Sequence, residues 1–376
     1  MSLFTIAASS FFHNPCPYDV KNLWTTTLAN IVQDTKLSSL TLIDYVLISD
    51  KQKKILVLLA DGEFHSGTEL AHALGVSRSA VWKQLGGLAE LGLQHAAVRG
   101  KGYRLDTPLE LLSVSAIQAF LNNRSGPLIS ALEIHDQIDS TNHYLALRSQ
   151  QGAKSGLVCF AEHQTAGKGR RGRQWVSPFG SNIYLSILWR FQLGYAAITG
   201  LSLAIGVAVI RALKQLGFND VGLKWPNDIY SQGKKLGGIL IEVSGESEGP
   251  CTAIIGLGLN RFLPDAAADS IAQAWTDLSK ISPSTLPSRN QLAGVLLNHL
   301  LAIIADFEQL GIQAYLEEWR SYDCLHNQPA TLFIGGQAFS GVIAGIDDNG
   351  LLLIKNTDGK VQAFASGEVS FHRTAL

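Results

Sequence analysis

Residues 164–175 read QTAGKGRRGRQW, and a strand-like apolar run lies on each side of them, SGLVCFAE (155–162) and NIYLSILWRF (182–191). Four cations, Lys168, Arg170, Arg171 and Arg173, fall within six positions, and glycines separate most of them. Glycine lets a backbone approach a ligand closely, and guanidinium groups offer forked donors to phosphate or carboxylate. The pattern predicts a flexible anion-binding loop between two strands of a mixed α/β domain.

This loop is not the P-loop of nucleotide-binding proteins. A P-loop has a glycine at the position that Glu162 occupies here, and a serine or threonine where this chain has Gly169. A glycine- and arginine-rich run can also be a nucleic-acid-binding tail, but the flanking strand patterns weaken that interpretation. We therefore expect a nucleotide or phosphate function.

The composition is that of a core-forming globular protein. The chain has 376 residues, a formal net charge of -1 and a hydrophobic fraction of 46%. That length allows two or three domains, and the near-zero charge confines anion binding to local patches. The four cysteines have no CxxC pair, so we expect neither a disulfide framework nor a metal cluster. The expected compartment is the reducing cytoplasm. The run LSLAIGVAVIRAL (201–213) is too short for a membrane helix and predicts a buried one; no membrane partner is expected.

Residues 51–93 contain three helical patterns in quick succession. Gly75 is placed to end the second helix and Ser77 to begin the third, which predicts a short turn typical of a helix-turn-helix. HAAVRGKGYRL (95–105) predicts a small hairpin, or wing, after it. The apolar faces of the helices are expected to consist of Ile55, Leu58, Leu59, Leu70, Ala73, Leu74, Ala80, Val81, Leu85, Leu88 and Leu91.

The charge of this segment favours DNA as its partner. Residues 51–104 hold eight Lys/Arg against four Asp/Glu, and five of these cations fall on the third helix and the wing. Small three-helix units also serve as protein-contact modules, so that alternative stays open. Gly86 and Gly87 each cost about 1 kcal/mol relative to alanine in a helix interior. Either packing demands a close approach of another group to the backbone at these glycines, or the third helix is shorter than its apolar pattern predicts.

Two further motifs have polar side chains at turns. KWPNDIY (224–230) places Lys224, Asn227 and Asp228 around a proline turn, where they could hold a phosphate with its Mg²⁺ or simply form an ordinary turn. IDSTNHY (138–144) places Ser140 and Thr141 at a strand-to-helix junction, as an N-cap or as ligands for a small polar molecule.

The remaining pattern divides the chain into domains. Strand-like runs at 234–243 and 251–260 and helix-like runs at 140–150, 196–216, 290–310 and 312–322 continue the α/β pattern. Turns at IGGQ, DDNG and NTDG punctuate short alternating strands at the end, which predicts a small β-barrel. We expect a poorly ordered extension at 1–49, a DNA-binding domain at 50–108, an α/β domain at 109–328 and the β domain at 329–376.

The motifs IDSTN, QTAGKGRRGRQWVSPFGSNIYLS, KWPNDIY, KLGGILIE and IGLGLN occur in the order and spacing of biotin protein ligases. With the helix-turn-helix ahead of them, residues from about 52 to 374 resemble the bifunctional biotin ligase/biotin operon repressors of bacteria. The resemblance implies a winged helix-turn-helix, a catalytic α/β domain like that of biotin and lipoate ligases, and an SH3-like C-terminal β-barrel. It implies a biotin–[acetyl-CoA-carboxylase] ligase that uses biotin and Mg²⁺·ATP, forms biotinyl-5′-AMP and biotinylates a lysine of biotin carboxyl carrier protein.

The family's motifs carry roles onto matching residues of this chain. Lys235 is implied as the central catalytic group, assisted by Arg170. No metal site is assigned, although Asp228 is a weaker candidate for a metal ligand. Biotin would be bound by Ser140, Thr141, Asn142, Gln164, Lys168, Gly169, Arg170 and Lys235. Trp175 would stack on adenine, and the nucleotide side would comprise Arg170, Arg173, Trp175, Lys224, Asn227, Gly256, Gly258 and Asn260.

The resemblance also implies regulation. Biotinyl-5′-AMP would act as corepressor by ordering loops that form a homodimer, which presents two helix-turn-helix units to a palindromic operator. One departure is Lys168, because the family's loop usually begins Gly-Arg-Gly-Arg; the charge is kept but the forked donor is lost, so looser retention of the adenylate is expected. A lipoate–protein ligase, or a ligand-sensing transcription factor without ligase activity, are the alternatives. The implied DNA contacts are Ser77, Arg78, Ser79, Lys83, Arg99 and Lys101.

Overall fold

The computed structural model describes residues 48–245, 249–282 and 285–371. The described residues belong to one compact unit, which begins at Ile48. The extension predicted over 1–49 lies outside the described residues, apart from its last two positions.

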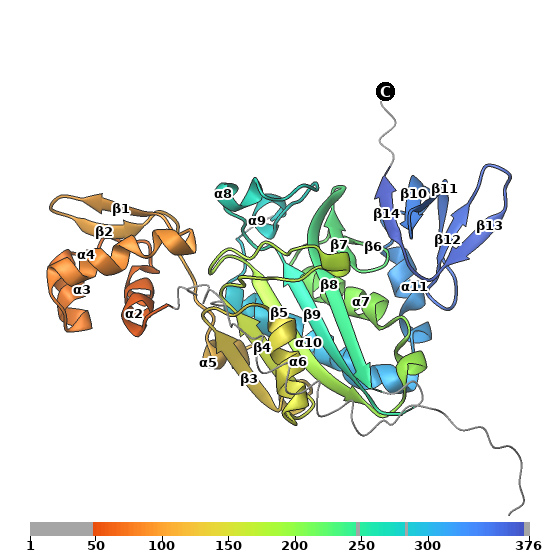
Figure 1. The fold of residues 1–376 in the computed structure, drawn as a ribbon, viewed down its shortest axis with the longest axis horizontal. Helices are drawn as coiled ribbons and strands as arrows, with labels where there is room; N and C mark the ends of the chain where they lie inside the picture. Colours follow the sequence, from red (N-terminus) through yellow and green to blue (C-terminus); the bar gives the residue numbers. More distant parts are fainter. Residues whose placement is uncertain (1–47, 246–248, 283–284, 372–376) are drawn as a thin grey trace, which may run out of the picture. The chain divides into compact units, whose positions relative to one another are not determined.

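Three short helices and a hairpin follow one another at the start of this unit (Figure 1). Gly75 ends the second helix in the left-handed conformation (φ 63°), and the Ser77 hydroxyl accepts a hydrogen bond from the amide of Ala80, so both predicted caps are present. The elements are α2 (Asp50–Leu59), α3 (Gly67–Leu74), α4 (Arg78–Gly86), the single-turn η1 (Ala89–Leu91), and the antiparallel pair β1 (His95–Val98) and β2 (Gly102–Leu105).

The small core of this module consists mostly of the predicted apolar residues. Ala73 is an exception, because the inward face of α3 is centred on positions 70, 71 and 74; Ala73 is exposed and Ala71 is buried. Helix α4 ends at Gly86, with Gly87 as its C-cap residue. The third helix is therefore shorter than its pattern predicts. Close packing applies at Gly87 as well, since a Cβ atom there would lie 2.4 Å from the Gln52 side chain. The buried side chains are Ile55, Leu56, Leu59, Leu70, Ala71, Val81, Leu85, Leu88, Leu91 and Leu105.

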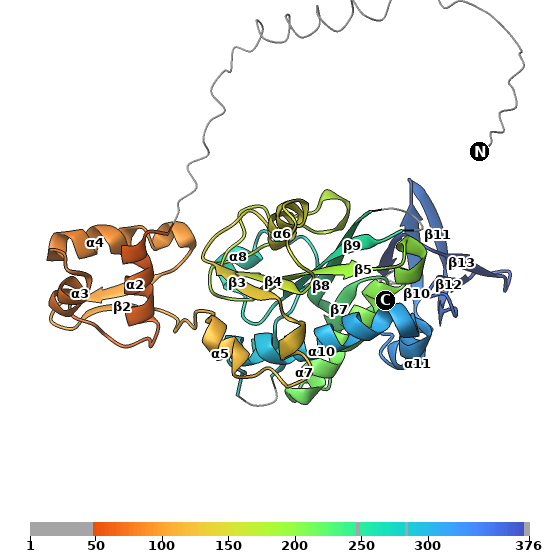
Figure 2. The same ribbon diagram turned by 90° about the horizontal axis from the view of Figure 1, so that it is seen from below.

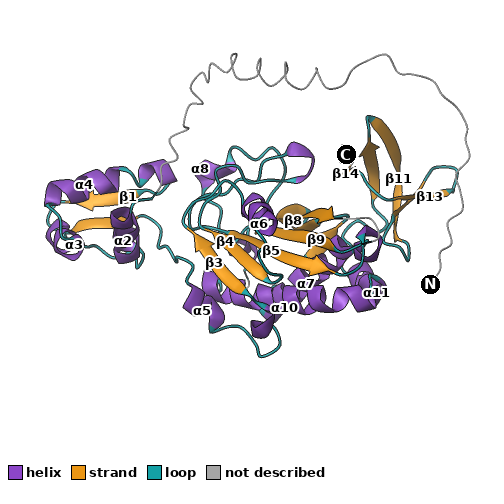
Figure 3. Cartoon of the chain, turned by 60° about the horizontal axis from the view of Figure 1, so that its bottom comes forward, coloured by secondary structure: helices purple, strands orange, loops and turns teal. Residues whose placement is uncertain are grey.

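A seven-stranded sheet forms the centre of the next domain (Figure 3). All four predicted strand runs are strands, and they lie side by side at its middle in the order β4, β5, β9, β8. Only β3 and β4 pair in parallel, because short turns join most of the others. In spatial order the strands are β3 (Ala131–His135), β4 (Leu157–Ala161), β5 (Ile183–Phe191), β9 (Cys251–Leu259), β8 (Lys234–Gly245), β7 (Asp228–Ser231) and β6 (Gly222–Lys224).

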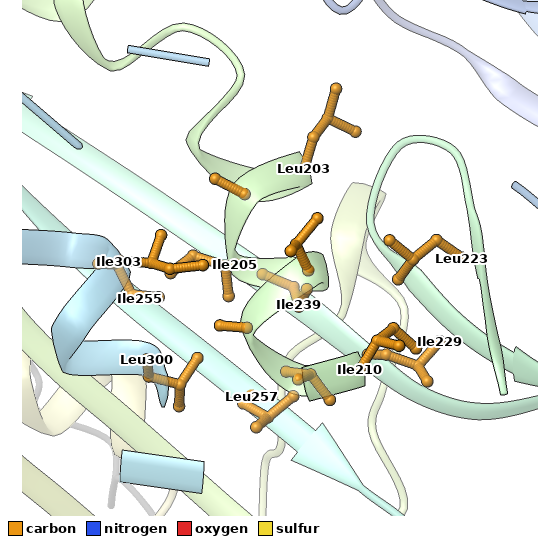
Figure 4. Packing of buried hydrophobic residues seen from close by; sticks show 14 of the residues in the cluster. Leu203, Ile205, Ile210, Leu223, Ile229, Ile239, Ile255, Leu257, Leu300 and Ile303 are labelled. Atoms are coloured by element: carbon orange, nitrogen blue, oxygen red, sulfur yellow. The ribbon is translucent and has the colours of Figure 1, made fainter. Parts of the chain in front are cut away.

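Helices cover both faces of this sheet (Figure 2). Helices α7 (Leu201–Gln215) and α10 (Arg289–Leu310) pack against each other on one face, and α6 (Thr141–Gln150) lies on the other, over β5 and β9. Ile205 of α7 packs with Ile255 of the sheet and Ile303 of α10 (Figure 4). The remaining helices of this domain are α5 (Val114–Gln118), η2 (Gly126–Leu128), η3 (Arg170–Gly172), η4 (Tyr195–Ile198), α8 (Asp265–Ala268), α9 (Leu278–Ile281) and α11 (Gln313–Ser321).

The C-terminal segment is the small all-β domain that its turn signals predict. Gly336, Gly350 and Gly359 of the three predicted turns all have positive φ, at 83°, 77° and 81°. Five antiparallel strands form one sheet in the order β13-β12-β11-β10-β14. Their bounds are β10 (Pro329–Ile334), β11 (Gln337–Ile346), β12 (Leu352–Lys355), β13 (Val361–Phe364) and β14 (Glu368–Phe371).

Among the described residues, two helical stretches are long and apolar enough to cross a membrane by length and composition, Tyr195–Gln215 and Arg289–Leu310. In each, 67% of the most apolar window is buried within the protein. They contain α7 and α10, whose apolar side chains pack on the sheet, so the buried helix predicted at 201–213 is confirmed.

Candidate active site

A cavity opens beside β5, β8 and β9, and residues from the anion-binding loop and the KWPND turn also line it. The sequence motifs that lie far apart along the chain therefore meet at one place. Of the residues predicted for biotin and nucleotide, the lining includes Ser140, Thr141, Asn142, Gln164, Lys168, Gly169, Arg170, Arg173, Trp175, Lys224, Asn227, Lys235, Gly256 and Gly258.

One end of the cavity is a buried group of neutral polar side chains at the start of α6. The Gln164 carbonyl accepts hydrogen bonds from the amide of Thr141 (2.9 Å) and from its hydroxyl (3.2 Å), while the Gln164 amide donates to Ser177. Ser140 is the N-cap residue of α6 by backbone position, but its side chain makes no capping hydrogen bond. Fixed neutral donors and acceptors at this end of the cavity suit a neutral polar ligand group that itself has both.

The sequence predictions missed a residue at the centre of this group, Ser186. Its hydroxyl lies 2.6 Å from the Asn142 side-chain oxygen and 2.7 Å from the Thr141 hydroxyl, and it is fully buried on β5. The Asn142 amide in turn donates to the Glu242 carboxylate at 2.7 Å. These contacts fix the orientation of Asn142. A lone serine within the apolar run IYLSILW was the signal for it.

Glycines form a flat floor under three of the site's side chains. A Cβ atom on Gly256 would lie 2.2 Å from the Asn142 side chain, and one on Gly258 would lie 2.4 Å from the Trp175 indole. A Cβ on Gly238 would lie 3.3 Å from the Lys235 side chain. Gly256 and Gly258 of IGLGLN are therefore required by close packing of a side chain on the backbone, whereas the contact at Gly238 of KLGGILIE is only tight.

Trp175 brings an unused donor to the cavity. Its ring covers Gly258, and its indole N–H is buried without a hydrogen-bond partner among the described residues. Burying such a donor costs about 1–3 kcal/mol, so an acceptor on a bound ligand is favoured there. The ring also lies 5.7 Å from the Lys235 ammonium, a distance at which cation–π attraction is effective.

Lys235 is held in place by Asp228. The ammonium lies 2.8 Å from the carboxylate, and both side chains are largely buried, at 14% and 17% exposure. In the β7–β8 pairing Ile229 lies opposite Gly237 and Tyr230 opposite Lys235, so the register shift leaves an extra residue, Leu236, in β8 directly beside Lys235. The pair places a positioned cation against the cavity, where it can stabilise negative charge on a reacting oxygen.

The loop cations divide between the cavity and its rim. Arg170 is half-buried and donates to the Asn227 side-chain oxygen at 3.0 Å; burial and the neighbouring Arg171 lower the pKa of its guanidinium. Arg173 pairs with the Glu368 carboxylate of β14, and Arg171 lies 3.8 Å from the same carboxylate. Exposed Lys168 pairs with Gln174 in a short β-bridge that closes the loop on itself.

Lys224 lies at the turn that carries Asn227. Its ammonium donates to the Tyr230 hydroxyl at 3.2 Å and lies 5.0 Å from the centre of that ring. Burial lowers the pKa of Lys224, while the nearby carboxylate of Asp228 raises it. A partly desolvated cation binds an anion more strongly than one in water, so Lys224 is suited to a phosphate oxygen.

Asn260 is the one residue of the predicted ligase site that does not line the cavity. It is buried, and its amide donates to the carbonyl of Thr276 at 3.1 Å. Its backbone accepts from the amide of Leu278. Asn260 therefore has a structural role: it holds the segment after β9 against helix α9.

The predicted DNA contacts lie on the outer surface of the helix-turn-helix module. Ser77 also caps α4, and its hydroxyl lies 2.9 Å from that of Ser79. Two wing cations lie over the Phe64 ring: the Lys101 ammonium is 5.8 Å and the Arg104 guanidinium carbon 4.7 Å from the ring centre. All six predicted residues are exposed: Ser77, Arg78, Ser79, Lys83, Arg99 and Lys101.

Comparisons with known proteins agree with this architecture. Residues 134–260 match the biotin/lipoate A/B protein ligase family, residues 51–104 match an HTH domain, and residues 326–372 match the biotin protein ligase C terminal domain. The structure is similar to that of a biotin protein ligase from Aquifex aeolicus in complex with biotin and ATP. That likeness has a TM-score of 0.54 at 26% identity and covers 64% of this chain and 98% of the other.

Curated relatives extend the similarity through the DNA-binding module. The chain is 41% identical to the bifunctional ligase/repressor BirA of Escherichia coli (strain K12), across 84% of this chain and 96% of that protein. It is 33% identical to the bifunctional ligase/repressor BirA of Bacillus subtilis (strain 168), across 80% of this chain and 92% of that one. The chain therefore belongs to the biotin protein ligases, and among them to the bifunctional ligase/repressors.

Proposed function

We propose that this protein joins biotin to a lysine of biotin carboxyl carrier protein at the expense of ATP, and that it represses transcription when biotinyl-5′-AMP is bound. The observation that supports the ligase function most is the meeting, around one cavity, of a neutral polar group, the Lys235–Asp228 pair and the cationic loop. Each of the three matches one part of a biotinyl adenylate.

The neutral end of the cavity suits the ureido ring of biotin. That ring has N–H donors and a carbonyl acceptor, and Thr141, Asn142 and Gln164 present fixed partners of both kinds. Leu185 and Leu257 line the space beside them, where an apolar valeryl chain can be covered. Lipoate has no ureido group, so this polar end favours biotin over lipoate.

In the first step a biotin carboxylate oxygen attacks the α-phosphorus of ATP. The new P–O bond forms biotinyl-5′-AMP, and the bond to the β-phosphate breaks to release pyrophosphate. Lys235, held by Asp228, stabilises the negative charge shared by the carboxylate and the α-phosphate oxygens, and Arg170, held by Asn227, acts on the same group. No side-chain nucleophile is needed.

In the second step the amine of the carrier lysine attacks the acyl carbon of the mixed anhydride. An amide bond forms, the C–O bond to AMP breaks, and the amine loses a proton. The described residues contain no group of three or more His, Cys, Asp or Glu side chains placed to hold a metal. Mg²⁺ is therefore expected to arrive with ATP and to be held mainly by phosphate oxygens.

The repressor function rests on the DNA-binding module. Exposed Arg78, Lys83 and the wing cations provide a surface for phosphate, and the adenylate is proposed to favour a homodimer that fits a palindromic operator. The proposed compartment is the cytoplasm, with which the three described cysteines agree, since Cys159, Cys251 and Cys324 are all free thiols.

Exchange of labelled pyrophosphate into ATP tests the first step directly. With the purified chain and Mg²⁺·ATP, exchange is expected when biotin is added and not when lipoate is added. Exchange with lipoate alone would establish a lipoate ligase instead. No exchange with either acid would leave a ligand-sensing transcription factor as the better account.

A further inference from the structure

Trp82 is the most exposed large apolar side chain of the described residues, with 70% of its surface open to solvent. It lies in the middle of α4, the second helix of the helix-turn-helix. An aromatic ring contributes nothing to the core from there, because the inward face of α4 is formed by Val81 and Leu85. Trp82 was not among the DNA contacts predicted from the sequence.

The residues around Trp82 on the helix surface are cationic or small. Arg78 lies one turn before it and Gly86 one turn after, while Lys83 is its neighbour along the chain. The helix contains no acidic residue, and a Cβ atom on Gly86 would meet nothing within 4 Å. The outward face of α4 is therefore an apolar ring flanked by positive charge, next to an open glycine that lets a large partner approach.

These properties distinguish between two possible partners. A second copy of this chain bound through the same face would bring Arg78 and Lys83 close to their own counterparts, and like charges oppose that contact. The DNA major groove has the opposite charge, and it displays one strongly apolar group, the 5-methyl of thymine. The second helix of a helix-turn-helix lies in that groove.

We propose that Trp82 reads thymine in the operator, through contact between its indole ring and the 5-methyl group. The inference rests on the proposed repressor function and adds a residue that determines sequence specificity. Arg78 and Lys83 bind the phosphates on either side and place the ring over the base edges. Specificity at this position then comes from burying an apolar surface instead of from a hydrogen bond.

Uracil substitution tests this contact, because it removes only the methyl group. The full-length chain, loaded with biotin and Mg²⁺·ATP, is used to select duplexes from a random DNA library. Each thymine of a selected duplex is then replaced in turn by deoxyuridine, and the dissociation constants are measured. One position or two per half-site should bind about fourfold more weakly, the value of one methyl group removed from water.

Substitutions of Trp82 test whether its ring makes this contact. Trp82→Ala should bind the thymine duplex about tenfold more weakly and should no longer distinguish it from the uracil duplex. Trp82→Phe, which keeps an apolar ring and lacks the indole N–H, should retain the discrimination. Val57→Ala, a change at another exposed apolar residue of the module (59% exposed), is the matched control and should behave as the wild-type chain does.

Three results would overturn the proposal: a Trp82→Ala protein that still distinguishes thymine from uracil, no thymine at which uracil weakens binding, or a loss of self-association in Trp82→Ala with DNA affinity unchanged. If the wild-type chain selects no duplex at all, the repressor function itself fails. That outcome is separate, because it is seen before any variant is compared.

Discussion

Replacing Arg289 by methionine should destabilise the catalytic domain more than any comparable change at its surface. Arg289 is fully buried at the start of α10, and its guanidinium lies 2.6 Å from the Glu162 carboxylate, which is itself 1% exposed. The guanidinium also donates to the carbonyls of Glu110 and Asn182. Methionine fills a similar volume but leaves a buried carboxylate without its counter-charge.

Breaking such a pair by removing one partner costs about 3–5 kcal/mol. For a domain of this size that corresponds to a fall in melting temperature on the order of 10 °C. The change is measured by thermal unfolding of the full chain, with the transition of the catalytic domain followed separately because a multidomain protein need not unfold in one step.

Two further variants make the test specific. Arg124→Met removes an exposed pair with Asp306 (59% and 39% exposed, 2.6 Å) and should change stability by less than about 1 kcal/mol. Glu162→Gln combined with Arg289→Met removes the uncompensated charge and should regain part of the loss. If the Arg289→Met and Arg124→Met proteins melt at the same temperature, the buried Arg289–Glu162 pair does not stabilise the domain as argued.

Three other perturbations follow from the site and the DNA-binding module. Gly258→Ala places a Cβ atom 2.4 Å from the Trp175 indole, so the ring must move; KM for ATP should rise about 5- to 100-fold while the fold is kept, and unchanged kinetics would disprove the close contact. Burial lowers the pKa of His65, but two carboxylates on either side of it raise the pKa by more, so the folded-state pKa is the higher one. The stabilisation from His65 is therefore complete below its unfolded-state pKa and is lost as the pH rises through its folded-state pKa. Urea unfolding should show the module more stable near pH 6 than near pH 8 by an increment that His65→Gln abolishes; an equal pH dependence in both proteins would contradict this. Lys168→Arg should slow dissociation of biotinyl-5′-AMP, measured beside the wild type, and dissociation that is no slower would show that the forked donor is not used.

Much of the architecture could be predicted because local signals agree with the fold. The caps at Gly75 and Ser77, the glycine turns of the C-terminal strands and the four long apolar strands each follow from backbone preferences or periodicity. The short strands β6 and β7 were not predicted, since three or four residues carry no readable period. β7 forms by pairing with the long strand β8, and β6 forms by pairing with β7 at the edge of the sheet.

The candidate site shows what sequence patterns do not predict. Motifs indicated which residues meet, but not the contacts that orient them. Ser186 of β5 fixes Asn142, and Asp228 of the neighbouring strand β7 holds Lys235. Trp82 was assigned neither to the predicted apolar face of the third helix nor to its DNA contacts, because the pattern does not tell how exposed a single ring is. The structure shows that Trp82 is the most exposed large apolar side chain of the described residues.

Transfer of biotin to a carrier domain tests the central claim most directly. The wild-type chain is incubated with biotin, Mg²⁺·ATP and a biotin carboxyl carrier domain, and the modified lysine is identified by mass spectrometry. Lys235→Ala is compared with Lys234→Ala, the exposed neighbour on the same strand. The wild-type and Lys234→Ala proteins should biotinylate one lysine at similar rates, with Lys235→Ala slower by about 100-fold or more. No biotinylated lysine with the wild-type protein, or equal rates for the two variants, would contradict the account.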